Sequence, residues 1–345
     1  MNPFTGLKYI PNTKELLDVA FARASKVTLP KSKKRPHIRA REKEIAKVDK
    51  VNDILTTRLE EVVKRFPNFD NIHPFYRTLA DTVVTIDDIR QALASVSSAI
   101  RIIRGILKDA KHNLRKASTP SEARNLRAAA YGRISSVMRK IDSRLMVIRQ
   151  AAIEYRRFPS IDLQLPVLVV AGFPNVGKSS LVTVLSSATP EIAEYPFTTK
   201  KISVGHVSLD SAGGQILDLP GLLDRPMKER NPIEQRAIAA IQYLADAIIF
   251  LIDPTLTCGY EPTSQAALFN EIRKAFPEVE IFPVINKMDI ALAEEVQRVR
   301  ILINIDGIPI ISTLTGEGVV SIFQEIISKS EKISGKLHAL QDQFL

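Results

Sequence analysis

Residues that can hold a phosphate group follow an aliphatic run at Val167–Ala171 in this chain of 345 residues. The run predicts a strand, and it leads into the pattern Gly-x-x-x-x-Gly-Lys-Ser and then into an apolar helical stretch. The glycines let backbone N–H groups and the helix N-terminus close around an anion, while the lysine supplies charge to the β- and γ-phosphates. The flanking strand and helix favour a nucleotide-phosphate site over a chance glycine turn. The expected site residues are Gly172, Phe173, Pro174, Asn175, Val176, Gly177, Lys178, Ser179 and Ser180.

A second candidate site element, Asp218-Leu219-Pro220-Gly221, follows a predicted strand about forty residues after the phosphate loop. An aspartate in this position can hold Mg²⁺ together with the hydroxyl of Ser179, and the Gly221 N–H can contact a γ-phosphate. Asp-x-x-Gly alone is a common turn. The order of the two motifs along the chain favours the functional interpretation.

A third element, Asn286-Lys287-Met288-Asp289, ends a predicted strand and carries a carboxylate suited to a purine base. Asp289 can accept hydrogen bonds from the N1 and N2 donors of guanine, which adenine does not present, and a site built this way rejects analogues that lack the group. Ser312, Thr313 and Leu314 follow the last predicted strand and are expected to back the edge of the base. The ordered motifs therefore predict GTP rather than ATP as the ligand.

Composition bounds the class of protein. The chain is 45% hydrophobic and 25% charged, as is usual for globular proteins. Its one cysteine, Cys258, excludes an intramolecular disulfide and favours a reducing, intracellular setting. The sequence shows no signal-peptide pattern and no apolar run long enough to cross a bilayer, so we expect a soluble, cytoplasmic protein.

Charge is distributed unevenly along the chain. Residues 1–160 hold 33 Lys and Arg against 16 Asp and Glu, a net +17, and residues 161–345 hold the remaining 15 and 22, a net −7. Opposite signs in the two parts are typical of a protein in which one part meets a polyanion. The alternative is that the surplus only solvates helices.

The pattern of residues 1–160 predicts helices. We expect them at residues 14–26, 37–65, 75–116 and 120–156. The third has a candidate bend at the β-branched cluster Thr82–Ile86, and the fourth is opened by a capping box at Thr119–Glu122. Together they predict an antiparallel helical bundle. Five basic residues share one helix face with Asp109 as the only acid among them: Arg101, Arg104, Lys108, Lys111 and Arg115. A phosphate backbone is the natural partner of such a stripe, and no base-reading motif accompanies it.

The second part alternates short strands with amphipathic helices, which predicts a mostly parallel sheet with helices on both faces. The expected strands are 165–171, 202–208, 214–218, 247–253, 280–285 and 308–312, and the expected helices are 179–187, 231–244, 262–275, 291–303 and 316–332. The fold class is thus α plus α/β: a basic helical, RNA-binding domain at 1–160, a Ras-like P-loop GTPase domain at 161–335 and a short tail at 336–345.

The motifs resemble those of a known family. The phosphate loop, the segment from Tyr195 to Lys200 and Asp218–Leu222 are similar to the Obg group of translation-factor-like GTPases. Four further marks resemble the nucleolar GTP-binding protein family: Asp224-Arg225-Pro226, Cys258-Gly259-Tyr260, His73-Pro74-Phe75-Tyr76 and Tyr131-Gly132-Arg133. Membership implies a GTPase of large ribosomal subunit assembly that binds ribosomal RNA through its helical domain. We expect the protein to be a monomer without a membrane partner. The end of the chain at Leu345 resembles the short archaeal form, for which we expect no nucleolar location.

The resemblance also assigns roles within the site. It implies that Thr199, in preference to Thr198 beside Phe197, joins Ser179 and Asp218 on Mg²⁺, and that Lys178, Thr199 and Gly221 are catalytic. Leu222 stands where related enzymes carry a water-orienting glutamine, so we expect slow intrinsic hydrolysis. Asn175 matches a position that helps to bind K⁺ in potassium-stimulated relatives, which makes K⁺ and the ribosomal particle the expected activators.

Three functions remain open from sequence. The first is a timer that docks on a pre-ribosomal particle and leaves after GTP hydrolysis. The second is an RNA-binding placeholder with a structural nucleotide, whose release would survive replacement of Asp218. The third, a membrane-remodelling GTPase, lacks an exposed apolar anchor stripe. We expect Asp253, Cys258 and Tyr260 to serve in packing or on a partner surface.

Overall fold

The computed structural model describes residues 1–30, 35–193, 201–209 and 212–341. The chain divides into two compact units. One comprises Pro3–Ile72 and Val83–Arg156, and the other comprises Met1–Asn2, His73–Thr82 and Arg157–Leu345. The second unit is therefore assembled from three stretches of chain, and the two units do not separate at one cut near residue 160.

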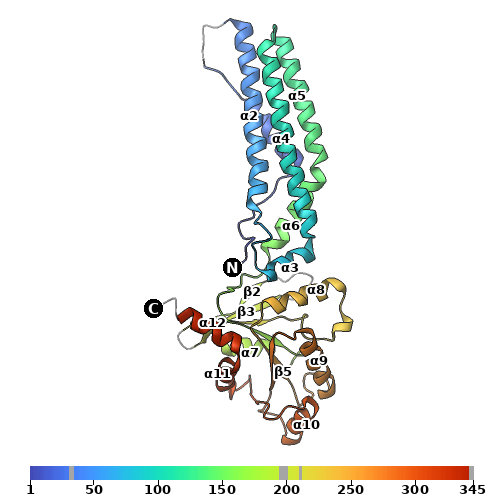
Figure 1. Cartoon of the computed structure of the whole chain (residues 1–345), viewed down its shortest axis with the longest axis vertical. Coiled ribbons are helices and arrows are strands. Elements are labelled where there is room, and N and C mark those ends of the chain that lie inside the picture. The colour runs from blue at the N-terminus through green and yellow to red at the C-terminus, as the bar shows by residue number, and fades with distance from the viewer. Residues whose placement is uncertain (31–34, 194–200, 210–211, 342–345) are drawn as a thin grey trace. The chain divides into compact units, whose positions relative to one another are not determined.

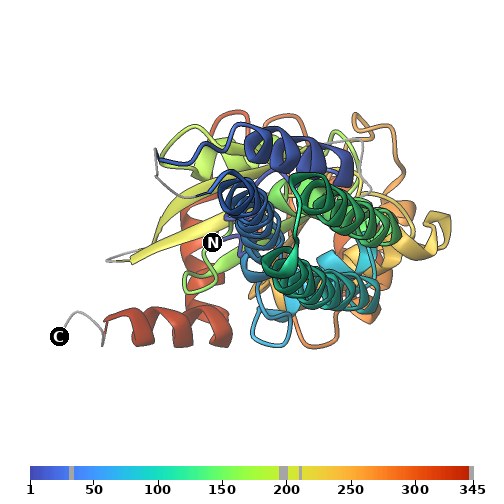
Figure 2. The ribbon, with the colours of Figure 1, turned by 90° about the horizontal axis from the view of Figure 1, so that it is seen from above.

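The first unit is helical, as expected. Its helices are α1 (Thr13–Ser25), α2 (Pro36–Arg65), α4 (Ile86–Lys116), α5 (Pro120–Lys140) and α6 (Asp142–Arg156). Long helices α2, α4 and α5 lie side by side with alternating direction (Figures 1 and 2), and α1 and α6 pack against α2 and α4. Leu55 and Leu59 of α2 and Ile89 and Ile103 of α4 are fully buried between the helices. Burial of this apolar stripe is the main force that holds the bundle together.

Two expected long helices are each broken once. Residues 75–116 form α3 (Pro74–Val83) and α4, because Thr85 adopts an extended conformation and its hydroxyl accepts the Asp88 N–H at 3.2 Å as an N-cap. Residues 120–156 form α5 and α6, which meet at Ile141 with φ −98° and ψ 3°. The start of α5 is as expected, since Thr119 caps it by accepting the Glu122 N–H.

Hydrogen bonds of Tyr76 connect helix α3 to the second unit. The Tyr76 hydroxyl donates to the Pro159 carbonyl at 2.8 Å and accepts from the Ile161 N–H at 3.1 Å. Burial raises the pKa of this phenol to about 12. The amino group of Met1 donates to the Ile161 carbonyl at 2.7 Å. These bonds tie α3 and the N-terminus to the segment that leads into the first strand.

The second unit is built on a mostly parallel sheet. Its strands are β1 (Val167–Ala171), β2 (Glu191–Ala193), β3 (Ile202–Leu209), β4 (Ala212–Asp218), β5 (Ala247–Ile252) and β6 (Glu280–Ile285), in the order β2-β3-β4-β1-β5-β6. β4, β1, β5 and β6 are parallel, and β2 and β3 add an antiparallel edge. In register, Val170 lies opposite Asp218, and Ile252 lies opposite Ile285. The phosphate loop, Asp218, Asp253 and Asn286 thus all lie at the carboxyl edge of the sheet, where ligands bind in such folds.

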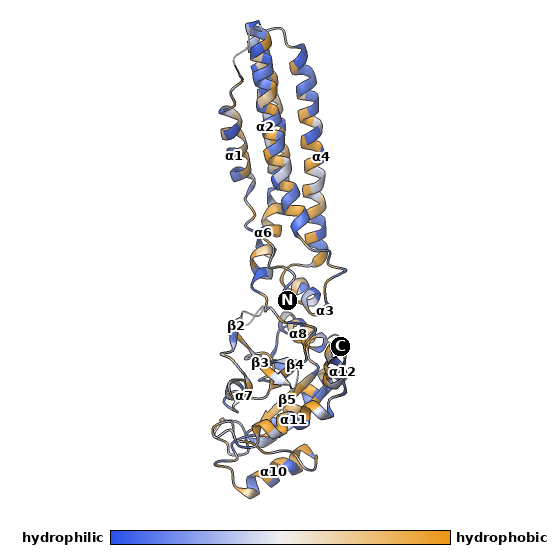
Figure 3. Ribbon diagram, turned by 90° about the vertical axis from the view of Figure 1, so that its left-hand side faces the viewer, coloured by the Kyte–Doolittle hydropathy of each residue, from blue (hydrophilic) through white to orange (hydrophobic). Residues whose placement is uncertain are grey.

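Helices cover both sides of this sheet (Figure 1). They are α7 (Lys178–Leu185), α8 (Pro232–Ala240), α9 (Pro262–Ala275), α10 (Ala293–Ile303), α11 (Val319–Lys329) and α12 (Glu331–Gln341). Helix α7 packs on β1, β3 and β4, and α9 packs on β5 and α10. The apolar central strand β5 and the apolar helix α11 stand out in Figure 3. All six residues of β5 are buried, which is typical of a parallel strand covered on both faces.

Three expectations near the end of the chain differ from the structure, and one sheet edge has an additional strand. The strand expected at 308–312 is only an isolated bridge between Ile310 and Ile285. The helix expected at 316–332 divides at Ser330 into α11 and α12, where the Ser330 hydroxyl donates to Glu280 at 2.5 Å. Because α12 runs to Gln341, the tail expected from residue 336 begins inside a helix. Strand β2 was not expected.

Among the helices in the part of the chain that the structure describes, none has both the length and the apolar character required to cross a membrane.

Candidate functional site

The phosphate loop folds tightly because its glycines have no side chains. Gly172 and Gly177 have φ of 130° and 104°, which other residues rarely adopt. A Cβ on Gly172 would lie 2.5 Å from the Leu251 carbonyl oxygen, and one on Gly177 would lie 2.2 Å from the Asn286 amide nitrogen. The loop therefore packs directly on β5 and on Asn286. Asn175 has φ 62° and is exposed at the loop.

Lys178 closes the loop on itself. Its ammonium group donates to the carbonyl oxygens of Gly172 at 2.9 Å and Phe173 at 2.8 Å, and the residue is 8% exposed. The positive charge is thus held within the loop, at the N-terminus of α7. Both features favour an anion at this position.

The two oxygen groups expected to hold Mg²⁺ are in contact. The Ser179 hydroxyl donates to Asp218 Oδ2 at 2.5 Å, so the N-terminus of α7 and the end of β4 meet at this point. A hydroxyl and a carboxylate are hard oxygen ligands of the kind Mg²⁺ prefers when phosphate and water complete its shell. The pair fits the expected ion in chemistry and in position.

Asn286 joins three of the predicted elements. Its amide nitrogen donates to the Val176 carbonyl at 2.8 Å and to the Thr313 hydroxyl at 2.9 Å, and its oxygen accepts the Thr313 N–H at 2.9 Å. Asn286 is buried, so each of its polar atoms has a partner within the protein. The phosphate loop and the two base-side loops are consequently held as one unit.

Asp289 is held in place but remains accessible. Buried Ser312 donates its hydroxyl to Asp289 Oδ1 at 2.5 Å, and the carboxylate is exposed. Met288 is fixed by an N–H bond to the Ile311 carbonyl at 3.0 Å. Leu314 is 84% exposed, and Ser180 is exposed on α7, so neither makes a buried wall.

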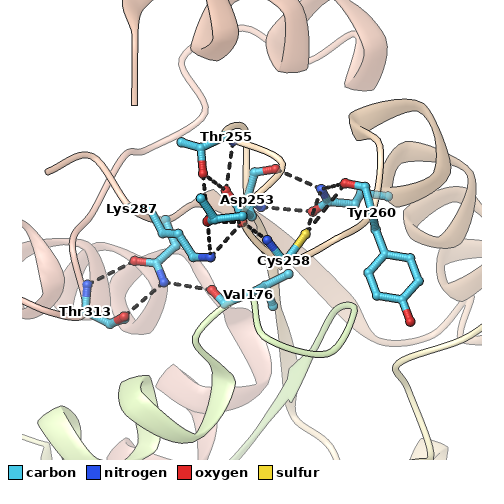
Figure 4. Close-up of polar contacts among 10 residues, drawn as sticks. Val176, Asp253, Thr255, Cys258, Tyr260, Lys287 and Thr313 are labelled. Carbon is cyan, nitrogen blue, oxygen red and sulfur yellow. Dashed lines mark hydrogen bonds and ion pairs between the residues drawn. The ribbon is translucent and has the colours of Figure 1, made fainter. Parts of the chain in front are cut away.

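Lys287 is oriented by Asp253, a contact that sequence reasoning did not assign (Figure 4). The Lys287 ammonium group donates to Asp253 Oδ2 and to the Thr257 hydroxyl, both at 2.7 Å. Burial alone would raise the pKa of Asp253, but hydrogen bonds from Lys287 and Thr255 outweigh it and hold the pKa at about 2. The signal available in sequence was an aspartate directly after a buried parallel strand.

The Cys258-Gly259-Tyr260 element packs beneath the same loops. Gln265 donates to the Asp253 and Tyr260 carbonyls at 2.8 and 3.0 Å (Figure 4), and the Tyr260 ring lies 4.2 Å from the Phe173 ring, measured between centroids. Cys258 is buried, and burial raises the pKa of its thiol. The predicted packing role stands for Cys258, whereas Asp253 positions a site lysine.

Gly221 lies in a loop with further buried charges that the sequence interpretation missed. The Gly221 N–H donates to Asp224 Oδ2 at 2.8 Å, and the Gly221 carbonyl accepts from Arg230 at 2.8 Å. Leu222 is 1% exposed, so its side chain faces the interior. Leu219 is also buried, and Pro220 is half-buried beside it.

Other predicted residues lie elsewhere. Phe197, Thr198 and Thr199 fall outside the described residues. The basic stripe belongs to the helical unit, and two of its members have acidic partners: Arg104 pairs with Glu60, and Lys111 pairs with Asp49 at 2.6 Å. Arg101, Lys108 and Arg115 are exposed and have no carboxylate partner within the described ranges.

A mostly parallel sheet that gathers these loops at its carboxyl edge places the second unit in the class of P-loop GTPases. Residues 4–162 match the NOG1 N-terminal helical domain, and residues 232–289 match Nucleolar GTP-binding protein 1 (NOG1). The chain belongs to the nucleolar GTP-binding protein 1 family, which confirms the resemblance seen in its motifs.

Individual relatives support this assignment. An uncharacterized protein of Methanocaldococcus jannaschii is 36% identical over 298 residues, which is 86% of this chain and 83% of the relative. Nucleolar GTP-binding protein 1 of Caenorhabditis elegans is 30% identical over 98% of this chain and 51% of its own length, and that of Arabidopsis thaliana is 33% identical over 85% and 44%. The chain thus spans about half the length of these eukaryotic relatives. A crystal structure of a candidate nucleolar GTP-binding protein 1 from Plasmodium falciparum is 32% identical, with a TM-score of 0.43 over 54% of this chain and 96% of that chain.

Proposed function

We propose that this chain binds GTP and hydrolyses it to GDP and phosphate as a molecular switch. The observation that carries the proposal is the Asn286 network, which joins the phosphate loop to the loops that would hold the base. Asp289, held by Ser312, supplies the acceptor for the guanine edge. A nucleotide that contacts both ends of this rigid unit is recognised by its phosphates and by its base together.

Asp289→Asn tests the base specificity. The amide offers a donor where guanine also presents a donor, whereas the C2 carbonyl of xanthine can accept that hydrogen bond. We expect the affinity for GDP to fall by about a hundredfold or more, because the bound base would cover residue 289 and the mismatch of donors would then leave polar groups unpaired. The affinity of the variant for xanthosine diphosphate should be higher than that of the wild-type chain. Calorimetric titration measures both affinities. An equal loss of affinity for both nucleotides, or an unchanged affinity for GDP, would contradict the assignment.

Hydrolysis would rely on phosphate positioning more than on a general base. Lys178 would neutralise the phosphates, Gly221 would donate its N–H to the γ-phosphate, and Ser179 with Asp218 would hold Mg²⁺. Bound Mg²⁺ would supply positive charge for the charge that develops on the phosphate oxygens. Thr199 remains the proposed third protein ligand of the ion. Buried Leu222 cannot orient water, which supports slow intrinsic turnover.

K⁺ is the proposed activator at the phosphate loop. Exposed Asn175 offers an amide oxygen beside the proposed phosphate position, and a monovalent cation there would add positive charge next to the transferred phosphate. We expect faster hydrolysis in KCl than in NaCl, with Asn175→Ala abolishing the difference. The readout is phosphate release at equal ionic strength, with and without ribosomal particles. Equal rates in both salts would remove K⁺ from the mechanism. Absence of turnover in every condition would favour the placeholder function.

The biological role proposed for the switch is assembly of the large ribosomal subunit in the cytoplasm, with docking on ribosomal RNA through the helical unit. Support comes from the net charge of +17 in residues 1–160 and from the name of the relatives, nucleolar GTP-binding protein 1. The alternative is an RNA-bound placeholder in which nucleotide is mainly structural, and buried Leu222 is the observation that favours it.

A further inference from the structure

The peptide groups of Gly221 are held on both sides by buried, oppositely charged side chains. Asp224 Oδ2 accepts the Gly221 N–H at 2.8 Å, and Arg230 Nη1 donates to the Gly221 carbonyl at 2.8 Å. Asp224 and Arg230 are each 5% exposed. Gly221 itself has φ 84°, so this geometry is reserved for glycine.

Asp224 and Arg230 are also linked to each other and to a helix. Their closest charged atoms, Asp224 Oδ1 and Arg230 Nη2, lie 3.9 Å apart, and Nη2 donates to the Arg225 carbonyl at 3.0 Å. Arg230 directly precedes Asn231, whose side chain caps α8 by accepting the Glu234 N–H at 2.8 Å. Arg230 therefore joins the Gly221 loop to the start of α8.

We propose that Asp224 stands in for the γ-phosphate at Gly221. The inference rests on the proposed function, in which the Gly221 N–H contacts the γ-phosphate of GTP. One N–H group makes one strong hydrogen bond, so the carboxylate and the phosphate compete for it, and their negative charges repel each other. GTP must displace Asp224 from Gly221, whereas GDP leaves the bond intact. Asp224 is thus a positioning residue that couples the third phosphate to Arg230 and α8.

There is space for the displaced carboxylate. A cavity of about 780 Å³ lies beside the loop, and Gly221, Asp224 and Pro174 all line it. Arg225 and Lys228 line the same cavity, as do Glu229, Glu234 and Glu271. Arg225 pairs with Glu234 at 3.2 Å, so Lys228 is the lining cation left to face a carboxylate that leaves Gly221. The exchange therefore requires no opening of the hydrophobic core.

The affinities for GDP and for a non-hydrolysable GTP analogue, GMPPNP, test the proposal. In the wild-type chain, GMPPNP must break the hydrogen bond between the Gly221 N–H and Asp224, which lowers its affinity, whereas GDP leaves that bond intact. Asp224→Ala removes that loss, so we expect the affinity ratio of GMPPNP to GDP to rise by roughly tenfold, as for a hydrogen bond with a charged partner. Asp224→Asn keeps an acceptor without the charge and should give a smaller rise. The readout is calorimetric titration with Mg²⁺ present.

Glu229→Gln is the matched control. Glu229 is exposed, lines the same cavity, and its side chain makes no hydrogen bond among the described residues, so its replacement removes equal charge without freeing Gly221. An equal rise in this variant would show that general repulsion, and not competition for the N–H, sets the ratio. An unchanged ratio in Asp224→Ala would also overturn the proposal. If Asp224→Ala does not fold, the affinity ratio in Asp224→Asn tests the proposal: a rise supports it and an unchanged ratio contradicts it.

The failure of this inference is distinguishable from failure of the proposed function. If the wild-type chain binds neither nucleotide, the GTP site itself is wrong. If it binds both and Lys178→Ala abolishes binding, the site stands. An unchanged ratio in the Asp224 variants then removes only the role of Asp224.

Discussion

Asp253 shows how one residue can organise a loop that contacts the base side of the site. The carboxylate is fully buried and accepts from the N–H and hydroxyl of Thr255, the hydroxyl of Thr257, the N–H of Cys258 and the ammonium group of Lys287. The carboxylate itself needs these donors, since its burial removes water as an alternative partner. The residue therefore stabilises the fold and orients Lys287 at the same time.

The lowered pKa of Asp253 makes a prediction for stability. A carboxyl group whose folded pKa of about 2 lies below its ordinary value of 3.8 stabilises the folded chain when ionised. The contribution is complete above about pH 4 and is lost as pH falls towards 2. We expect Asp253→Asn to lower the free energy of unfolding at pH 7 by about 2 kcal/mol and to flatten the stability profile between those values.

Urea denaturation followed by circular dichroism, at pH steps from neutral to acid, measures this effect. Asp306→Asn is the control, because Asp306 is an exposed acid on the same unit and makes no hydrogen bond through its side chain among the described residues. If Asp253→Asn lost no more stability than Asp306→Asn at neutral pH, the role of Asp253 would be refuted.

At the scale of elements, the central strands and the loops after them could be predicted from sequence. Strand β1 is an aliphatic run that leads into the glycine loop, and the mostly apolar strands β5 and β6 are followed directly by Asp253 and Asn286. The parallel register brings the ends of all three strands to one edge. The site loops were therefore predictable as a group. The strand expected at 308–312 was not formed, because only Ile310 bridges to Ile285 before the chain turns at Ser312.

Helix ends were less predictable than helix positions. Apolar residues keep helical spacing on both sides of Thr85 and Ile141, so periodicity alone favoured continuous helices. The breaks depend on local backbone geometry and on distant partners, such as the Thr13 hydroxyl that donates to Asp142 at the start of α6. The Asp224–Arg230 pair was missed for a similar reason, since only the folded loop brings both residues to Gly221.

At the scale of the whole molecule, ion pairing divides the basic stripe into two kinds of residue. Arg104 and Lys111 already have carboxylate partners on α2, whereas Arg101, Lys108 and Arg115 do not among the described residues. Lys108 and Arg115 also border a cavity of about 300 Å³ with both paired residues. The three unpaired cations are the ones with charge available for a phosphate backbone.

Replacement of Arg101, Lys108 and Arg115 by glutamine tests RNA docking. We expect weaker binding to purified large-subunit ribosomal RNA and a shallower dependence of affinity on salt, by roughly 0.7 in the slope for each phosphate that is no longer neutralised on a single strand. Filter binding across a series of KCl concentrations measures both. A variant with glutamine at Lys8, Lys14 and Lys26 removes the same charge from exposed positions of the helical unit and should change the slope less. Equal slopes for the two variants, or crosslinks in cells confined to transfer or messenger RNA, would overturn docking through this face.

The bonds of Tyr76 have a consequence for the order in which the chain can fold during its own synthesis. Tyr76 leaves the ribosome 83 residues before Pro159 and 85 before Ile161, its two hydrogen-bond partners. The second stretch of the helical unit, Val83–Arg156, is made in that interval. Helix α3 can therefore form its hydrogen bonds to Pro159 and Ile161 only after the helical unit has been translated. The GTP-binding unit can be completed only after the proposed RNA-binding unit has emerged in full.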